Sequence, residues 1–457
     1  MEQLSKDLVK KIPPPVFKIF QKFTQEGYQI YLVGGAVRDL LLGREIHDAD
    51  FATNAHPEEI QKLLPESFYD NVFGTVGLMV GPEKYEITTY RREQGYTDRR
   101  RPDQVSWGQS LKEDVIRRDF TINALALGPE LKIIDLVNGQ EDLEKKIIRA
   151  VGAPEERFAE DALRMMRAIR FATQLGFTIE PETFAAIRKN NELIKFVSWE
   201  RIRDELFKIL TSPYPVEGIT LLYTSGLLGH ILPELVRCYG VTQAKHHKLD
   251  VWAHSLESLR HVPSEDPIVR LATLIHDIGK PITAKGEGQA RTFYNHEVIG
   301  GYLAAKIAQR LRLSKKDSER LFRLVRWHLF TVDERQTDAA IRRFIRHVGS
   351  ENLEDILALR VGDRLGGGAK ETSWRLEKFK ERLVEVQKQP FTVTDLKING
   401  FDVMKILGIS PGPKVGGVLN QIFQEVVEQK IPNERETLLK RLEEIKNKEI
   451  ATRTSEH

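Results

Sequence analysis

The sequence predicts an α+β protein in which a part containing strands precedes an all-helical part. Apolar runs of strand length, such as 28–33, 76–80 and 85–91, lie in the first 152 residues. From Ala153 onward, apolar residues recur at helical spacing instead. We therefore expect a small sheet near the N-terminus, followed by helices as far as the C-terminus.

Composition restricts the class of protein and its compartment. The chain has 457 residues, 41% hydrophobic and 30% charged, which is typical of a globular protein of about two to four domains. No apolar run reaches membrane-spanning length, and the N-terminus lacks the apolar core of a signal peptide. The single cysteine, Cys238, cannot form an internal disulfide. We expect a cytoplasmic protein without a membrane partner, whose net charge of +3 leaves RNA binding to local patches.

Local signals predict the N-terminal elements in order. The prolines at 13–15 begin an amphipathic helix ahead of the first strand, and 54–65 is an N-capped helix. Two strand-like runs are joined by residues 81–84, which predicts a hairpin with a 4-residue turn. Residues 111–127 begin as a helix, and 133–152 form a last strand, a turn and a short helix.

Asp48 and Asp50 are separated by one residue. In an extended segment, residues i and i+2 point to the same side, so the two carboxylates lie together. Such a pair can bind Mg²⁺ while the ion also holds substrate phosphates. A lone D-x-D pair is more often a surface turn, so the spacing does not establish a metal site by itself.

A glycine pair, Gly34-Gly35, lies upstream of the two aspartates and is followed by Arg38 and Asp39. It comes between an apolar run and a helical pattern, and a strand, a glycine turn and a helix start offer backbone N–H groups to a phosphate. Together with the two aspartates, this pattern favours a site for a nucleoside triphosphate and a metal.

The motifs around these residues resemble a known family. GGAVRD at 34–39 and HDADFAT at 47–53 are similar to the head domain of class II tRNA nucleotidyltransferases, the CCA-adding enzymes and their bacterial poly(A) polymerase relatives. RRDFTINALAL at 117–127 and EDALRMMRAIRFA at 160–172 resemble further motifs of that family in the same order. The resemblance implies a nucleotidyltransferase head built on a small mixed sheet.

The resemblance also implies an activity and its partners. The chain would add CCA to the 3′ end of tRNA without a template, using CTP, ATP and Mg²⁺ and releasing pyrophosphate. We expect no obligate protein partner. The implied site residues are Asp48 and Asp50 for the metal, Glu86 beside them, and Gly35, Arg38 and Arg118 for the triphosphate. Glu86 has the alternative of a cross-strand pair at the surface, and Asn123, a polar residue in an apolar run, predicts a specific hydrogen bond.

Four charged residues, Asp161, Arg164, Arg167 and Arg170, recur at every third position. On one helix, a step of three residues turns each side chain by about 60°, so the four would form a slowly winding polar stripe. Alone, such a stripe is a solvated basic face. Beside the head motifs, we interpret Asp161 and Arg164 as readers of the base edge, and Arg167 and Arg170 as phosphate contacts.

Residues 92–110 are rich in charge and poor in apolar residues, which predicts a mobile loop. In the resembling family, a flexible loop here separates enzymes that finish with A from those that stop after CC. This chain has the full-length loop, including Asp98, Arg99, Arg100 and Pro102. A plain solvated linker is the alternative.

A second set of ligand-type residues follows in the helical part. It consists of His254, His276, Asp277, His296, His328 and Asp363. An adjacent His-Asp pair can offer an imidazole and a carboxylate to one cation. The ordered set resembles the HD-domain metal phosphohydrolases. The resemblance implies a first metal at His254, His276, Asp277 and Asp363, and a second metal or phosphate contact at His296 and His328. An imidazole-rich site suits Ni²⁺, Mn²⁺ or Co²⁺, and a metal-free scaffold is the alternative.

The expected domains are a head at 1–152, a helical neck at 153–215, an HD body at 216–390 and a tail at 391–457. In the tail, a proline-glycine turn opens a helix near Lys414, which could hold an RNA phosphate. The chain after Asn447 is polar and is expected to be disordered.

Other functions stay open at this stage. Two have the same fold: an enzyme that adds only the final A, and a poly(A) polymerase. An enzyme that adds only CC is disfavoured by the full-length loop. In another class, the HD domain would be the main enzyme, a nucleotide or cyclic-phosphate hydrolase. A non-catalytic RNA-binding protein would not need Asp48 and Asp50.

Overall fold

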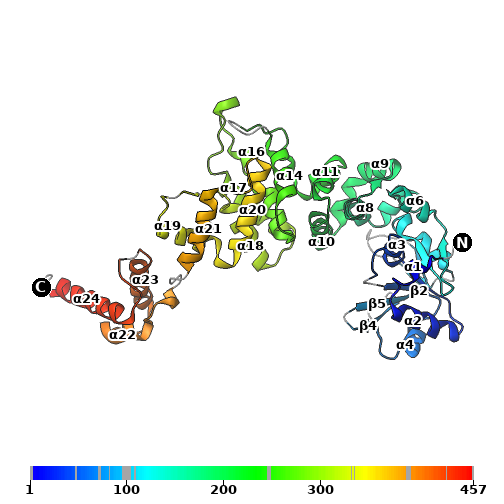
Figure 1. Cartoon of the computed structure of the whole chain (residues 1–457), viewed down its shortest axis with the longest axis horizontal. Helices are drawn as coiled ribbons and strands as arrows, with labels where there is room; N and C mark the ends of the chain where they lie inside the picture. Colours follow the sequence, from blue (N-terminus) through cyan, green and yellow to red (C-terminus); the bar gives the residue numbers. More distant parts are fainter. Residues whose placement is uncertain are drawn as a thin grey trace. The chain divides into compact units, whose positions relative to one another are not determined.

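The protein is described from a computed structural model of the whole chain (Figure 1). The structure describes residues 4–46, 49–69, 74–81, 83–94, 104–107, 110–243, 249–330, 332–333, 335–387, 393–428 and 430–454. The chain divides into two compact units. The first comprises residues 1–241 with 265–267 and 306–314, and the second comprises 242–264, 268–305 and 315–457.

The first unit contains a seven-stranded sheet in the order β3-β4-β5-β2-β1-β8-β9. The strands are β1 (Ile30–Val33), β2 (Ala49–Thr53), β3 (Phe68–Tyr69), β4 (Thr75–Val80), β5 (Glu83–Thr89), β8 (Leu125–Leu127) and β9 (Ile133–Asp135). β2 and β5 run parallel, whereas the other neighbours are antiparallel. The predicted α+β class with an N-terminal mixed sheet is confirmed.

Short helices accompany this sheet in the first unit. They are α1 (Lys6–Val9), α2 (Pro14–Gln25), α3 (Gly35–Leu41), α4 (Pro57–Leu63), α5 (Leu111–Ile116), the 3₁₀ turn η1 (Thr121–Asn123) and α6 (Gly139–Lys145). α2 begins at the prolines, as predicted, and buries Val16, Phe20 and Phe23 at helical spacing. The ring of Phe20 meets that of Phe51 on β2 edge-to-face, with centroids 5.8 Å apart.

Two predictions for this region need correction. The β4–β5 hairpin pairs Val80 with Glu83, so its turn has two residues rather than four. Gly81 supplies the positive φ of +64° that a tight turn requires, which lets Glu83 and Lys84 join the ladder. The predicted loop also begins and ends in strands, because β6 (Arg91–Gln94) and β7 (Gln104–Trp107) pair antiparallel. Asp98, Arg99, Arg100 and Pro102 lie outside the described residues.

The helices after the sheet begin with α7 (Pro154–Glu160) and α8 (Leu163–Leu175). The prediction that the four charged residues from Asp161 to Arg170 share one helix is therefore wrong. The backbone leaves helical geometry at Asp161. The Asp161 carboxylate accepts a hydrogen bond from the N–H of Leu163, which favours a new helix start there. The rest of this region is β10 (Ile147–Ile148), β11 (Thr178–Ile179), α9 (Pro181–Asn190), η2 (Asn191–Phe196), α10 (Trp199–Leu210), α11 (Pro215–Thr224), α12 (Leu227–Ile231) and α13 (Pro233–Val236).

The strand β11 interrupts the helical neck predicted for 153–215, because it pairs with β10. Helices dominate the rest of the chain. Those before the tail are α14 (Val251–His261), α15 (Pro267–Ile275), α16 (Lys280–Thr283), η3 (Gly288–Ala290), α17 (His296–Arg310), α18 (Lys315–Arg326), α19 (Asp338–Val348), η4 (Ser350–Asn352), α20 (Leu353–Gly366) and α21 (Trp374–Gln387). No described helix combines the length and hydropathy needed to cross a bilayer.

α14 and α20 pack closely because α20 carries glycines at the contact. A Cβ built on Gly362 would lie 2.7 Å from the carbonyl oxygen of Ser258, so no larger residue fits without a backbone shift. This close approach brings His254 of α14 and Asp363 of α20 to 3.2 Å. The packing of two helices thus assembles part of the histidine cluster.

The tail consists of η5 (Val393–Asp395), α22 (Gly400–Leu407), α23 (Pro413–Val427) and α24 (Arg435–Thr454). It has an apolar core of its own, which includes Val403, Ile422 and Leu438. α23 opens after the proline-glycine turn, as predicted. α24 continues through Thr454, beyond Asn447, and the expected disorder of the last residues stays a prediction. Once Leu438 and neighbouring residues anchor this helix, each further residue extends it at little cost.

Candidate functional site

Parallel pairing places two of the three predicted acidic residues side by side. Asp50 on β2 is the register partner of Glu86 on β5, and both are accessible to solvent. Glu86 forms an ion pair of 2.8 Å with Lys84. Asp48 lies outside the described residues. The sheet therefore offers carboxylate oxygens at one place, and these are the donors that Mg²⁺ prefers.

The glycine turn lies close to the Asp50 carboxylate. Gly34 ends β1 with a φ of +74°, which favours glycine. A Cβ built on it would lie 3.0 Å from Nη1 of Arg118 and 3.7 Å from Oδ2 of Asp50. The start of α3, Arg118 and Asp50 thus meet within a few ångströms, although they lie far apart in the sequence.

Arg118 is positioned by a carboxylate that sequence reasoning did not identify. Its Nη2 and Nε lie 2.9 and 3.2 Å from Oδ2 of Asp114, which Arg117 also contacts. Burial would raise the pKa of Asp114, but the two guanidinium groups outweigh burial and lower it to about 2. The spacing of Asp114 to Arg117 and Arg118, i to i+3 and i+4 on one helix, was the available signal.

Arg38 points into the protein. Its guanidinium donates two hydrogen bonds to Asp39, of 3.0 and 2.7 Å, and one of 2.6 Å to Oδ1 of Asn123. The amide of Asn123 donates in turn to Asp119, at 3.2 Å, which confirms the predicted specific hydrogen bond. Gly35 lies against this guanidinium, since its Cβ would be 3.4 Å from Nη2 of Arg38.

The arginines predicted to face phosphates are paired with buried carboxylates. Nε of Arg167 lies 2.8 Å from Asp119, and Nε of Arg170 lies 2.6 Å from Glu205. Burial would raise the pKa of Asp119, but Arg167 lowers it to about 2. Arg38, Arg167 and Arg170 also surround the ring of Phe171, at 5.3, 5.4 and 4.0 Å from its centroid. Phe171 and Glu205 were missed, because an apolar residue and a distant acid carry no local signal.

The predicted base readers do not contact each other through their side chains. The Asp161 carboxylate accepts hydrogen bonds from Arg201, at 2.7 and 3.3 Å. Arg164 bonds Glu160 at 2.7 Å and the carbonyl of Arg117 at 3.0 Å. Arg164 therefore links α8 to the segment that carries Arg118. Arg201 on α10, which was not predicted, joins the candidate base site through its contact with Asp161.

In the second unit, all six predicted ligand residues converge. Asp277 lies between two groups of potential ligands, and the ligand atoms within each group are within 4.8 Å of one another. Its Oδ2 lies 3.5 Å from Nε2 of His254 and 3.3 Å from that of His276. Its Oδ1 lies 3.2 Å from Nε2 of His296 and 3.7 Å from that of His328. Asp363 faces the first group, 3.2 Å from His254 and 3.6 Å from His276.

Backbone hydrogen bonds orient three of these imidazoles for metal binding. Nδ1 of His276, His296 and His328 lies 2.7, 2.8 and 2.7 Å from the carbonyl oxygen three residues earlier. A ring that donates its Nδ1–H to a carbonyl presents the Nε2 lone pair on its other side. These lone pairs point at carboxylate oxygens and at one another, and Nε2 of His254 and His276 are 3.2 Å apart. Lone pairs at such separations repel unless a cation lies among them, so the donor set fits a divalent metal.

Burial and neighbouring charges shift the pKa values of two histidines in this cluster. Burial would lower the pKa of His276, but Asp277 and Asp363 raise it to about 10. Burial, with His276 nearby, lowers the pKa of His328 to about 3. Asp277 is paired with Lys280 and Asp363 with Arg360, so both carboxylates have cationic partners in the protein. The cluster opens into a cavity of about 760 Å³ that Lys280, Arg291 and Arg360 also line.

Comparison with known proteins agrees with both the head motifs and the fold. Residues 30–149 match the family model of the poly A polymerase head domain, 176–238 that of an RNA and SrmB-binding site of polymerase A, and 303–442 that of tRNA nucleotidyltransferase domain 2. The CCA-adding enzyme of Levilactobacillus brevis is 36% identical over 92% of this chain and 95% of its own length.

Two further similarities are informative. The A-adding tRNA nucleotidyltransferase of Deinococcus radiodurans is 37% identical over 86% of this chain and 90% of its own. The crystal structure of the Bacillus stearothermophilus CCA-adding enzyme in complex with CTP matches with a TM-score of 0.71 and 30% identity. That match covers 96% of this chain and all of the other. With relatives of this identity and coverage, the chain belongs to the tRNA nucleotidyltransferase family that contains the CCA-adding enzymes.

Proposed function

We propose that the chain adds the terminal CCA of tRNA in the cytoplasm, using CTP and ATP and releasing pyrophosphate at each addition. The pairing of Asp50 with Glu86, beside the Gly34 turn and Arg118, is the observation that carries the proposal. It combines an acidic place for a metal with a basic place for a triphosphate. The Levilactobacillus relative is a CCA-adding enzyme, which agrees with this chemistry.

Asp48 and Asp50 would hold Mg²⁺, with Glu86 supporting them. When bound, Mg²⁺ lowers the pKa of the RNA 3′-hydroxyl and neutralises the leaving pyrophosphate. Arg118 and the N–H groups after Gly34 orient the triphosphate, so that its α-phosphorus faces the 3′-hydroxyl. Arg38 stabilises this turn through hydrogen bonds to Asp39 and Asn123.

Base choice requires a planar set of donors and acceptors, since no template is present. Asp161 supplies acceptors and Arg164 supplies donors. Arg201 restrains the Asp161 carboxylate and Glu160 restrains Arg164, so both enter the base site from fixed positions. Arg167 and Arg170 stay the predicted phosphate contacts, although each already pairs with a carboxylate of the protein.

The remaining parts serve tRNA binding in this proposal. We retain the division into a head at 1–152, a neck at 153–215, an HD body at 216–390 and a tail at 391–457. Duplex RNA is recognised mainly by shape and by its phosphates. The helical body and the start of α23 near Lys414 would therefore grip the acceptor arm rather than read its sequence.

The test of this function uses three tRNA transcripts, which lack CCA, lack CA or lack only the final A. Each receives CTP, ATP or both, and the products are separated at single-nucleotide resolution. We expect two additions with CTP alone on the first transcript, and completion only with both nucleotides. Extension of only the third transcript would show an A-adding enzyme like the Deinococcus relative, and long A tracts would show a poly(A) polymerase.

We also propose that the histidine cluster is a metal-dependent phosphohydrolase that opens 2′,3′-cyclic phosphates. The inward-facing Nε2 atoms around Asp277 carry this proposal, because they form a donor set for Ni²⁺, Mn²⁺ or Co²⁺. Bound there, the metal would activate water. Water adds to phosphorus, one ester bond breaks, and the leaving ribose oxygen takes a proton, so a phosphomonoester forms. Lys280, with Nζ 2.5 Å from Asp277, places a further positive charge beside the phosphate.

The assay is hydrolysis of 2′,3′-cyclic AMP and of a chromogenic phosphodiester across a panel of divalent metals. Hydrolysis should appear with at least one transition metal and disappear with a chelator. Failure with every metal, together with no bound metal by elemental analysis, would leave the cluster as a scaffold.

A further inference from the structure

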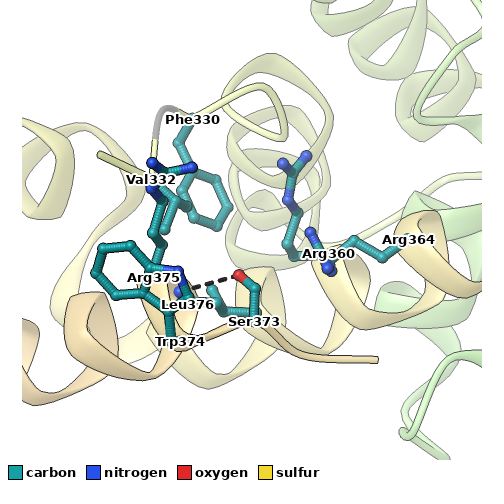
Figure 2. A pocket seen from close by; sticks show the side chains of 8 residues that line it. All are labelled: Phe330, Val332, Arg360, Arg364, Ser373, Trp374, Arg375 and Leu376. Atoms are coloured by element: carbon teal, nitrogen blue, oxygen red, sulfur yellow. Dashed lines mark hydrogen bonds between the residues drawn. The ribbon is translucent and has the colours of Figure 1, made fainter. Parts of the chain in front are cut away.

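A second cavity, of about 380 Å³, shares Arg360 with the cavity at the histidine cluster, and Figure 2 shows the residues that line it. It is formed by the C-terminal half of α20, the first turn of α21 and the segment after α18. Its lining is Phe330, Val332, Arg360, Arg364, Ser373, Trp374, Arg375 and Leu376. Among the described residues, this lining includes three arginines and no carboxylate, which is the composition of an anion site.

Arg360 connects this cavity to the histidine cluster, because it lines both. Its Nη1 lies 3.1 Å from Oδ2 of Asp363, one of the candidate metal ligands. Its Nε is buried and has no hydrogen-bond acceptor among the described residues. A buried N–H without an acceptor is unfavourable, so a ligand oxygen at this position would satisfy it.

Arg364 and Ser373 hold the opposite wall in place. Nε of Arg364 donates to the carbonyl of Lys370 at 3.0 Å, and Nη2 to that of Thr372 at 3.4 Å. Ser373 caps α21 by accepting a hydrogen bond of 3.3 Å from the N–H of Leu376 (Figure 2). The segment that carries Trp374 is therefore anchored rather than loosely attached.

Trp374 and Arg375 present an aromatic face and a cation together. The Trp374 side chain is 61% exposed, and the guanidinium carbon of Arg375 lies 5.0 Å from its ring centroid. Nucleobases stack on such rings regardless of sequence, and neighbouring arginines bind the backbone phosphates.

We propose that this cavity binds the penultimate nucleotide of an RNA 3′ end, while the terminal phosphate lies at the histidine cluster. Its base stacks on Trp374, and the phosphodiester between the two nucleotides contacts Arg360, Arg364 and Arg375. The proposal rests on the proposed phosphohydrolase function of the cluster. It makes RNA ends, rather than free mononucleotides, the preferred substrates, and the preference depends on length rather than on sequence.

Binding is tested first, with the full chain free of metal. The probe is an adenylyl dinucleotide with a 3′-phosphate, measured by equilibrium dialysis. Trp374→Ala and Arg375→Gln should each weaken binding by about ten-fold. The matched controls are Tyr302→Ala and Arg343→Gln, which replace an exposed aromatic and an exposed arginine elsewhere. Binding at other nucleotide sites contributes equally to all five proteins, and circular dichroism verifies their folding.

Hydrolysis is tested second, as the ratio of kcat/KM for a dinucleotide ending in a 2′,3′-cyclic phosphate to that for 2′,3′-cyclic AMP. The wild type should favour the dinucleotide by about ten-fold or more, and both cavity variants should reduce this ratio toward one. If no metal supports hydrolysis, the phosphohydrolase proposal fails and the binding experiment alone decides the cavity. Dinucleotide binding that is equal in the wild type and both cavity variants would overturn the cavity proposal, whatever the hydrolysis.

Discussion

The head site and the histidine cluster are organised in opposite ways. In the head, the cationic residues are already neutralised by protein carboxylates: Arg118 by Asp114, and Arg167 by Asp119. In the cluster, imidazoles and two carboxylates face one another, with Lys280 beside Asp277 and Arg360 beside Asp363. The first arrangement pairs its cations within the protein, whereas the second gathers imidazole nitrogens of the kind that bind a metal.

This difference predicts how each site responds to the loss of a residue. A nucleotide entering the head competes with internal ion pairs, so substitutions there should change rates and selectivity while the fold persists. If the cluster holds the proposed metal, a substitution of one of its ligands should change the metal content itself. The following experiments exploit this contrast, in order of expected effect.

Removing the head carboxylates should give the largest effect. Asp50→Asn or Asp48→Asn should reduce nucleotide addition by about three orders of magnitude or more, because metal chemistry is lost. tRNA affinity in a filter-binding assay should persist, since the acceptor arm is gripped elsewhere. Glu83→Gln, on the same strand as Glu86, is the matched control. Normal turnover in both aspartate variants would refute the metal assignment.

Removing the shared carboxylate of the cluster comes second. Asp277→Asn should abolish hydrolysis of 2′,3′-cyclic AMP and lower the bound metal measured by elemental analysis, because both ligand groups use Asp277. CCA addition should stay within about two-fold of the wild type, since the sites share no residue. Glu354→Gln, an exposed carboxylate on α20, serves as the control. A parallel loss of CCA addition would show that the two sites are coupled.

Deleting residues 94–102 should separate the two nucleotide specificities. C addition should continue at a comparable rate, while A addition falls by about a hundred-fold, because the segment would reshape the pocket rather than build it. Single-turnover assays on transcripts that lack CCA or only the final A measure the two steps. An equal loss of both steps would make the segment part of the structural framework.

Substituting the base-reading residues should have a moderate effect. Asp161→Ala or Arg164→Ala should cost about 1–3 kcal/mol of discrimination between CTP and ATP, because a hydrogen-bonded contact is lost. Arg201→Gln should show a smaller change of the same kind, since Arg201 holds Asp161. Misincorporation ratios measure this, with the exposed Arg188→Gln as the control. Unchanged ratios in the Asp161 and Arg164 variants would place base reading elsewhere.

Acid should weaken the Asp119–Arg167 pair, with the smallest effect. Because the native pKa of Asp119 is lowered to about 2, its ionised form stabilises the fold above the unfolded pKa of about 3.9. Its contribution, roughly 2 kcal/mol at pH 6, is lost as the pH falls toward 2. The difference in urea-unfolding midpoint between the wild type and Asp119→Asn should therefore shrink from pH 6 to pH 3. Two results would contradict this account. One is a midpoint difference for Asp119→Asn that is the same at pH 6 and pH 3. The other is an equal change with pH for the exposed Glu58→Gln.

Several structural features could be predicted because their causes are local. The prolines at 13–15 begin α2, and the glycine pair ends β1 and opens α3. Alternation along β5 places Glu86 on the accessible face, beside Asp50. The single-helix stripe from Asp161 to Arg170 failed for an equally local reason. A spacing of three cannot reveal that the Asp161 side chain bonds the N–H of Leu163 and starts a new helix.

The sequence by itself determined the chemistry of both sites, because residue types and their order specify which ligands are offered. It placed six side chains of metal-ligand type in one helical region and the glycine and arginine motifs in one mixed region. Only the tertiary structure decided their partners. Asp114, Glu205 and Phe171 became site residues through contacts across the fold. Likewise, one oxygen of Asp277 lies near His254 and His276 and the other near His296 and His328, because packing between helices brings these residues together. Such contacts depend on packing between distant segments, and no local pattern encodes packing.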